Sequence, residues 1–131
     1  MSARETNRPL SATEFSLARW MLEHGSPEAS GFLEQLLAAE ITPWRCSCGC
    51  ASVNFQIKGR QPAPPGVRIL GEFFFGPNDK PAGIFIFASE GVLSGIEVYG
   101  LATDAPAALP REEALRPFPS SSGESSPADG S

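Results

Sequence analysis

The spacing of apolar residues changes along the chain from a helical period to a strand period, and this change constrains the fold most. Between Phe15 and Ile41, apolar residues recur every three or four positions, as on one face of a helix. After Cys50 they alternate with polar residues, as in a half-buried strand. The pattern predicts an α+β domain, with an N-terminal helical hairpin packed on one face of an antiparallel meander of about four strands.

Two helices are predicted in the first third of the chain, each with recognisable ends. Ser11 and Glu14 have the spacing of a capping box, and Gly25 is expected to end the first helix as a left-handed residue. Ser26 then caps a second helix, which has proline at its first position and is ended by Pro43. The buried stripe of the second helix consists of Phe32, Leu33, Leu36, Leu37 and Ile41.

Four strands are predicted in the second half, at residues 52–58, 67–75, 83–89 and 92–99. The prolines of the loop 59–66 exclude this loop from a central strand. Glu90 and Gly91 are predicted to form a tight turn between the last two strands. In a meander, each strand would pair with the next one along the chain.

The chain has 131 residues, of which 41% are hydrophobic, enough for one domain with a core of its own. This single α+β domain is predicted to cover residues 11–116. Residues 1–10 are predicted to be a flexible N-terminus. Residues 117–131 are rich in serine and are predicted to be a disordered, low-complexity tail.

Charge and hydropathy argue against two classes of partner, nucleic acids and membranes. The formal net charge is −5 and the basic residues are scattered, so no nucleic acid is expected as a partner. The longest apolar run, from Ile84 to Ala88, is too short to span a bilayer, so no membrane association is expected. The N-terminus lacks the pattern of a signal peptide. A cytoplasmic location is therefore predicted, in agreement with an odd number of cysteines.

All three cysteines lie in one segment, Cys46-Ser47-Cys48-Gly49-Cys50. On an extended chain Cys46, Cys48 and Cys50 point to one side, and thiolates are suitable ligands for zinc or Cu(I). A structural zinc site needs a fourth ligand, which His24, a carboxylate or a second subunit would have to supply. The alternative is that the thiols fill a tight bend as small apolar groups. We favour this alternative because the segment itself contains no fourth ligand.

No group in the sequence indicates catalysis. A cysteine nucleophile would need a neighbouring base, and His24 is the only histidine. Glu72 and Glu97 lie among apolar neighbours in predicted strands and would share a pocket if they faced the same side. The alternative is that both are ordinary solvated residues. We assign no catalytic residue and no cofactor, and we do not expect an enzyme.

The predicted strands 67–75 and 83–89 are apolar on both faces. Because two helices cover only one face of a sheet, the other face is predicted to be an exposed apolar patch, which is typical of an interface. We therefore predict a homodimer formed through the sheet. The predicted interface residues are Leu70, Phe74, Ile84 and Ile86. The alternative is that the C-terminal segment containing Leu109, Leu115 and Phe118 folds across this face.

Two short motifs carry a resemblance to a known group. The Cys-x-Cys-Gly-Cys segment at 46–50 and the strand Leu93-Ser94-Gly95-Ile96-Glu97-Val98-Tyr99 resemble segments shared by small uncharacterised bacterial proteins. The resemblance covers about residues 41–115. It implies a bacterial cytoplasmic protein with a single compact domain, and it implies no activity and no residue roles.

These observations favour a cytoplasmic, non-catalytic binding or interaction module that self-associates through its sheet. The alternative is a thiolate metal-binding protein that uses Cys46, Cys48 and Cys50. A cysteine-dependent enzyme is the least favoured hypothesis.

Overall fold

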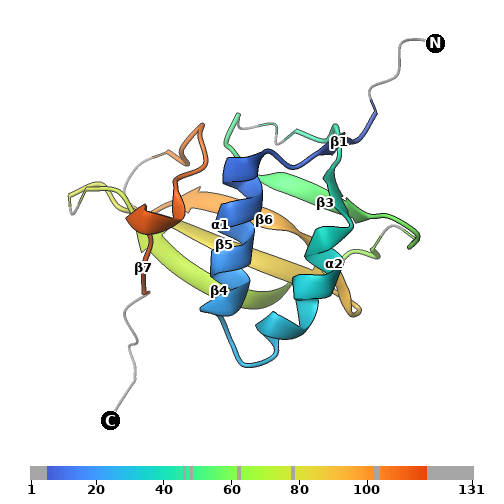
Figure 1. Cartoon of the computed structure of the whole chain (residues 1–131). Helices are drawn as coiled ribbons and strands as arrows, with labels where there is room; N and C mark the ends of the chain where they lie inside the picture. Colours follow the sequence, from blue (N-terminus) through green and yellow to red (C-terminus); the bar gives the residue numbers. More distant parts are fainter. Residues whose placement is uncertain are drawn as a thin grey trace.

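The computed structural model describes residues 6–45, 47, 49–61, 63–77, 79–101 and 104–117. Within them, seven antiparallel strands form one sheet in the order β1-β2-β3-β6-β5-β4-β7, with α1 and α2 on one of its faces (Figure 1). The strands are β1 (Arg8–Pro9), β2 (Ala39–Ile41), β3 (Val53–Ile57), β4 (Arg68–Phe75), β5 (Ala82–Ser89), β6 (Val92–Gly100) and β7 (Arg116–Pro117). The helices are α1 (Ala12–Glu23) and α2 (Leu33–Leu37), and the 3-10 helices are η1 (Ala29–Phe32) and η2 (Glu112–Ala114).

The predicted fold class is wrong in both of its layers. The sheet has seven strands instead of about four, and β3 pairs with β6 instead of β4, so the strands do not form a simple meander. The second layer is not a helical hairpin, because α1 is followed by the single turn of η1 and the five residues of α2. Residues 39–41, expected to end the second helix, form β2 and pair with β3.

The outermost strands are two-residue Arg-Pro pairs. β1 pairs with β2, and β7 pairs with β4. Two residues have no hydrophobic period, so their sequence does not indicate a strand. Arg8 and Pro9 therefore belong to the sheet although a flexible N-terminus was expected there. Pro117 likewise ends β7, and the remainder of the predicted tail lies outside the described residues.

Helix α1 begins as predicted, with a complete capping box. The Ser11 hydroxyl accepts a hydrogen bond from the Glu14 N–H at 3.1 Å, and the Glu14 carboxylate accepts one from the Ser11 N–H at 2.8 Å. Arg8 donates to both oxygens of this carboxylate, and this contact lowers the pKa of Glu14. Glu14 thus connects β1 to the start of α1 through its hydrogen bonds with Arg8 and Ser11.

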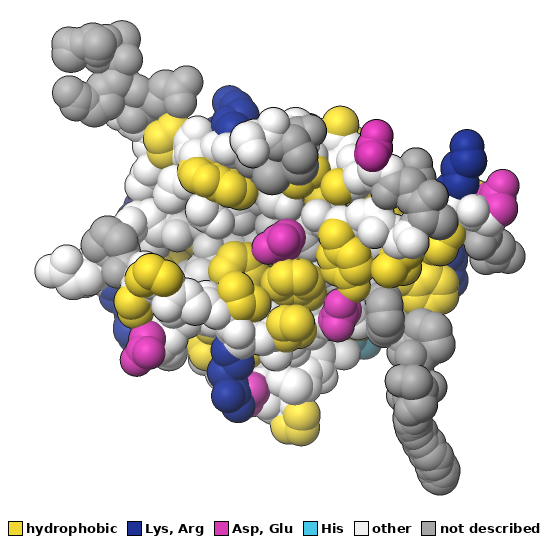
Figure 2. All heavy atoms as spheres, turned by 180° about the vertical axis from the view of Figure 1, so that it is seen from behind, with side chains coloured by type: hydrophobic (Ala, Val, Ile, Leu, Met, Phe, Trp, Pro, Cys, Tyr) yellow, Lys and Arg dark blue, Asp and Glu magenta, His cyan; other side chains and the backbone are white. Residues whose placement is uncertain are grey.

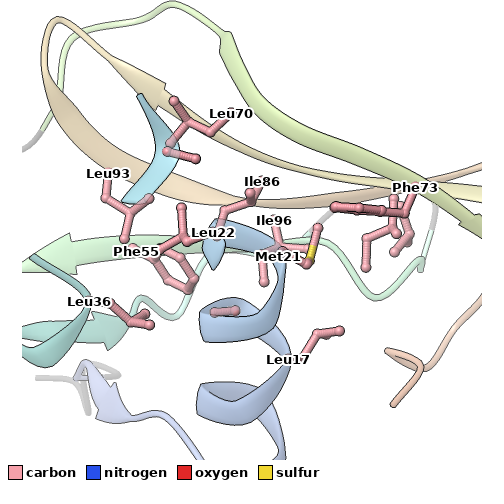
Figure 3. Close-up of a cluster of buried hydrophobic side chains, with 14 of the residues drawn as sticks. Leu17, Met21, Leu22, Leu36, Phe55, Leu70, Phe73, Ile86, Leu93 and Ile96 are labelled. Atoms are coloured by element: carbon pink, nitrogen blue, oxygen red, sulfur yellow. The ribbon is translucent and has the colours of Figure 1, made fainter. Parts of the chain in front are cut away.

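The core lies between the helical layer and the sheet. In Figure 3, the labelled side chains of α1 and α2, such as Met21 and Leu36, lie close to labelled side chains of the sheet, such as Phe55 and Ile96. Leu70, Ile84 and Ile86 are each 0% exposed here. Three of the four residues predicted to form an interface are therefore core residues and are not available to a partner. The residues of α1 that are buried in this core are Leu17, Ala18, Met21 and Leu22.

An irregularity in β4 explains why the face of Leu70 is not evident from the sequence. The register between β4 and β5 shifts between Ile69 and Gly71, as at a β-bulge. A bulge interrupts the two-residue alternation, so residues on its two sides change face relative to each other. Leu70 is consequently buried, like the odd-numbered Phe73 and Phe75.

Gly25 ends α1 for a different reason from the predicted one. Its backbone is not left-handed. Instead, the chain runs so close to β4 that a Cβ at Gly25 would lie 2.3 Å from the Leu70 carbonyl oxygen. The next N–H, that of Ser26, donates to the same oxygen at 2.7 Å. Glycine is required because the turn after α1 is hydrogen-bonded directly to the backbone of β4.

The part of the C-terminal segment from Leu109 to Leu115 lies on the helical side of the sheet. η2 stands beside α1 (Figure 1), and the Ser16 hydroxyl of α1 donates to the Glu112 carboxylate at 2.7 Å. Leu115 is buried in the same core as α1, and Leu109 packs against that core. These residues do not cover the opposite face, as the alternative for Leu109 and Leu115 required. Phe118 lies outside the described residues.

Candidate functional site

The face of the sheet turned away from α1 carries the most distinctive group of side chains in the described chain. We call this surface the open face. It is formed by alternate residues of the three longest strands, β4, β5 and β6, and the residues between them point into the core. Figure 2 shows it from behind, with hydrophobic side chains gathered near the centre and acidic side chains among them. The residues of the open face are Glu72 and Phe74 of β4, Phe85 and Phe87 of β5, and Glu97 and Tyr99 of β6.

The strand register arranges these side chains in rows across the sheet. Phe85 is the direct cross-strand neighbour of Glu72 on one side and of Glu97 on the other. Directly opposed residues have Cβ atoms about 5 Å apart. One aromatic ring is therefore flanked by two carboxylates. Glu72 and Glu97 were predicted to be neighbours only if they faced the same side, and the structure places them on one face.

The next row contains a glycine that is covered by a tyrosine ring. Gly83 lies between Phe74 and Tyr99 in the register. A Cβ at Gly83 would lie 2.1 Å from Cζ of Tyr99, so the ring crosses β5 directly above this glycine. The hydroxyl reaches β4, where it donates a hydrogen bond to Oε2 of Glu72. Tyr99 thereby fixes the position of one carboxylate of the open face.

The aromatic rings of the open face contact one another and a cation. Phe85 lies 5.7 Å from Phe87 and 6.1 Å from Tyr99, measured between ring centroids. The Arg116 guanidinium lies 4.4 Å from the centroid of Phe74, and its Nη2 donates to the Gly76 carbonyl at 2.7 Å. The face thus already holds one guanidinium above an aromatic ring.

The environment of Tyr99 gives a titration that can be measured without a label. Burial raises the pKa of its phenol above the ordinary value of 10.0, and the hydrogen bond to Glu72 and the charge of Glu72 raise it further. Tyr99 is the only tyrosine in the chain. We expect its ultraviolet phenolate absorbance to appear well above pH 10.0, and the substitution Glu72→Gln to shift this titration to lower pH.

The same shift has a consequence for stability. Because the folded phenol holds its proton more tightly than the unfolded one, the stabilisation is complete below pH 10.0 and is lost as the pH rises toward the folded pKa.

Glu34→Gln on the exposed side of α2 is the control for the Tyr99 titration and should leave it unchanged. A wild-type titration centred at pH 10.0 would contradict the described contact.

A cleft of about 360 Å³ adjoins the open face at Phe87. Its roof is the proline-rich loop, which is held in place because the Ser89 hydroxyl donates to the Pro64 carbonyl at 2.6 Å. Asn54 and Gln56 of β3 and Ser94 of β6 line the floor. None of the described residues that line this cleft is charged. The cleft therefore adds neutral polar groups to the surface next to the open face.

Only one of the three cysteines falls within the described residues. Cys50 precedes β3, is half-buried, and places its Sγ 3.2 Å from the Ser52 hydroxyl, which accepts a hydrogen bond from the Val98 N–H. Cys46 and Cys48 lie outside the described residues. Among the residues that are described, no three His, Cys, Asp or Glu side chains are grouped as metal ligands. The thiolate metal hypothesis is therefore not tested by the described residues.

His24 does not lie near Cys50. Cys50 lines a cleft together with Ser11, at the N-terminus of α1. His24 caps the other end of this helix, where its ring stacks on Trp20 with 4.1 Å between centroids. A helix of 12 residues is about 18 Å long. The fold therefore separates the predicted fourth ligand, or catalytic base, from the described cysteine.

Phe74 is the one aromatic residue of the open face that was predicted to lie in the interface; Phe85, Phe87 and Tyr99 were not predicted there. Phe85 and Phe87 alternate with the buried Ile84 and Ile86. Both sets are apolar, so polarity does not show which set meets the helices. A usable signal was the glycine at position 83, since a strand glycine often marks close approach by another group.

A comparison of the chain with protein-family models, curated proteins and solved structures finds no match. Within the described residues, no helix has both the length and the apolar character needed to cross a membrane.

Proposed function

We propose that this protein is a non-catalytic interaction module and that the open face is its binding surface for another polypeptide. The observation that carries the proposal is the group of four aromatic side chains on the open face, Phe74, Phe85, Phe87 and Tyr99, which no described helix covers. These side chains are only half-buried, and apolar surface that remains partly accessible to solvent commonly marks an interaction site. Aromatic residues are also the side chains most enriched where binding energy concentrates in protein interfaces.

The edges of the sheet are less suited to binding than its face. An unpaired edge strand pairs readily with another chain, and short edge strands with proline reduce this tendency. Both edges here are two-residue strands that end in proline, β1 at Pro9 and β7 at Pro117. Side-chain packing on the face is therefore the mode of association that we propose.

The charges of the open face favour a partner that differs from this chain. Packing two copies face to face would bring Glu72 and Glu97 of both into one interface, and the chain has a formal net charge of −5. Like charges placed close together in an interface oppose association. A different polypeptide is therefore the first candidate. The predicted homodimer is the second candidate, because the aromatic side chains of two open faces are able to stack on each other.

Site-specific photo-crosslinking tests the proposal. A photoreactive phenylalanine analogue is introduced at Phe85 in cells of the protein's own organism, and the same analogue at Leu37 serves as the control. Leu37 is 75% exposed on the helical side, so it matches Phe85 in apolar character without lying on the open face. We expect a discrete adduct from position 85 and none from position 37.

The mass of the adduct distinguishes the two candidates. An adduct at twice the chain mass of 13.9 kDa identifies a second copy, and any other discrete mass identifies a different partner. Thermal unfolding of both labelled variants confirms that each is folded. The absence of an adduct at position 85 in a folded variant, or the same adduct from both positions, would overturn the proposal.

A further inference from the structure

We infer that the open face binds a basic segment of its partner, with one arginine or lysine side chain held over Phe85 between Glu72 and Glu97. The inference rests on the proposed function and names the chemistry of the partner. It is carried by the charges of the face, by the geometry of the central row and by a contact that the chain makes with its own arginine.

The two carboxylates of the open face are not neutralised by the described chain. Four ion pairs occur among the described residues: Arg8–Glu14, Arg19–Glu23, Lys58–Glu40 and Arg68–Glu28. None of them includes Glu72 or Glu97. The only basic side chain described in contact with the open face is Arg116, which is engaged by Phe74 and by the Gly76 carbonyl. The centre of the face therefore has a negative potential that a cationic side chain would balance.

The geometry of the central row suits a cation above the ring of Phe85. The ring lies between its two cross-strand neighbours, Glu72 and Glu97. The π-face of an aromatic ring attracts a cation, and flanking carboxylates strengthen the attraction by direct pairing. The Tyr99 hydroxyl holds Oε2 of Glu72, which leaves the other oxygen of this carboxylate to accept a bond from the ligand. Glu97 is exposed and is the cross-strand neighbour of Phe85 on β6.

The chain already makes this type of contact one row away on the same face. The Arg116 guanidinium lies over the ring of Phe74, at 4.4 Å from its centroid. Phe74 and Phe85 belong to neighbouring strands, and Phe85 pairs with Glu72, two positions before Phe74. The occupied ring has no cross-strand carboxylate, since its neighbours are Gly83 on β5 and Arg116 on β7. The ring of Phe85 has two, so it is the better cation site of the two rings.

The rings around this site define the rest of the partner segment. Phe87 lies on one side of Phe85 along β5, and Tyr99 lies on the other side. An extended peptide directs alternate side chains to one side. A segment with the pattern apolar-x-basic-x-apolar would therefore place its basic residue over Phe85 and its two apolar residues over the neighbouring rings.

A matched pair of peptides tests the inference. The first is the acetylated and amidated pentapeptide Leu-Ser-Arg-Ser-Leu, and the second replaces its arginine by citrulline, which has nearly the same shape without the charge. Binding is followed by NMR titration of the wild-type protein and of Glu72→Gln/Glu97→Gln, with Glu34→Gln as the control. Glu34 is an exposed glutamate of α2 on the helical side of the sheet.

We expect the wild-type protein to bind the arginine peptide at least tenfold more tightly than the citrulline peptide, with shifts centred on residues of the open face. The double variant should lose this preference, and Glu34→Gln should keep it. Added salt should reduce the preference, because the carboxylates are not deeply buried.

The outcomes separate this inference from the proposed function. Equal binding of the two peptides to the open face, or a preference that survives the double substitution, would overturn the cationic site and leave the interaction surface supported. Failure of both peptides to bind would overturn the cationic site as well. The photo-crosslinking result at position 85 then decides independently whether the open face binds a partner.

Discussion

Replacing Gly25 by alanine lowers the free energy of unfolding by about 3 kcal/mol, the upper part of the range for overpacked sites. The new Cβ would lie 2.3 Å from the Leu70 carbonyl oxygen and 2.9 Å from that of Met21, and both are backbone atoms that cannot rotate away. The end of α1 would have to separate from β4 and lose the hydrogen bond from Ser26. Chemical denaturation measures the change directly, and thermal unfolding should show a fall of roughly 10 °C.

Gly31 provides the matched control. It lies in η1, and no atom is found within 4 Å of the position that its Cβ would occupy. Gly31→Ala should therefore leave the stability within about 0.5 kcal/mol of the wild-type value, as is usual for surface substitutions. If the two substitutions changed the stability equally, the described contact between the turn after α1 and β4 would be wrong.

Ile86→Ala lowers the free energy of unfolding by about 3 kcal/mol, whereas Phe85→Ala lowers it by no more than about 1.5 kcal/mol. Ile86 is 0% exposed beneath the helices, so its truncation leaves a cavity. Phe85 is half-buried on the open face and loses contacts only with its neighbours there. Truncation of the larger side chain, Phe85, is thus expected to lower the stability less than truncation of the smaller one, Ile86.

Denaturation of the two variants, together with peptide titration, separates core from surface. Phe85→Ala should abolish the preference for the arginine peptide while the protein stays folded. Ile86→Ala should retain the preference under conditions where the variant is folded. A larger loss of stability for Phe85→Ala than for Ile86→Ala would mean that the two faces of β5 are assigned the wrong way round.

The parts of the fold that follow from local chemistry were predictable. The capping box of Ser11 and Glu14 specifies the start of α1 because it satisfies backbone groups within one turn. The tight turn at Glu90 and Gly91 is confirmed, with positive φ angles of 52° and 78°. The four longer strands were recognisable because each has a run of apolar residues long enough to show a period.

The parts that depend on distant partners were not predictable. The short strand β2 exists because Ala39 and Ile41 pair with β3, and the chain leaves a helical turn to make that pairing. The bulge in β4 has no signal of its own before the register with β5 is known. Local periodicity also cannot show that β3 joins β6, because hydrophobic pattern specifies a strand and not its neighbour.

The candidate site was predictable only in part. Glu72 and Glu97 stood out because a charged residue in an apolar strand is unusual, and their common face was stated as a condition. The aromatic residues were not assigned to the open face, because Phe85 and Ile86 are equally apolar and only the position of the helices distinguishes them. The role of Gly25 was missed because its cause is the backbone of a strand 45 positions further along the chain at Leu70.

The pairing of β3 with β6 also determines the order in which the protein is able to fold. β4, β5 and β6 follow one another along the chain and form two hairpins through short connections, whereas Val53 meets Ile96 only after the intervening chain has closed a long loop. On a ribosome, the first half of the protein would have no completed sheet to pack against until β6 had emerged. The nascent N-terminal half would therefore expose the apolar stripe of α1 through most of synthesis, a period in which chaperone binding is of greatest use.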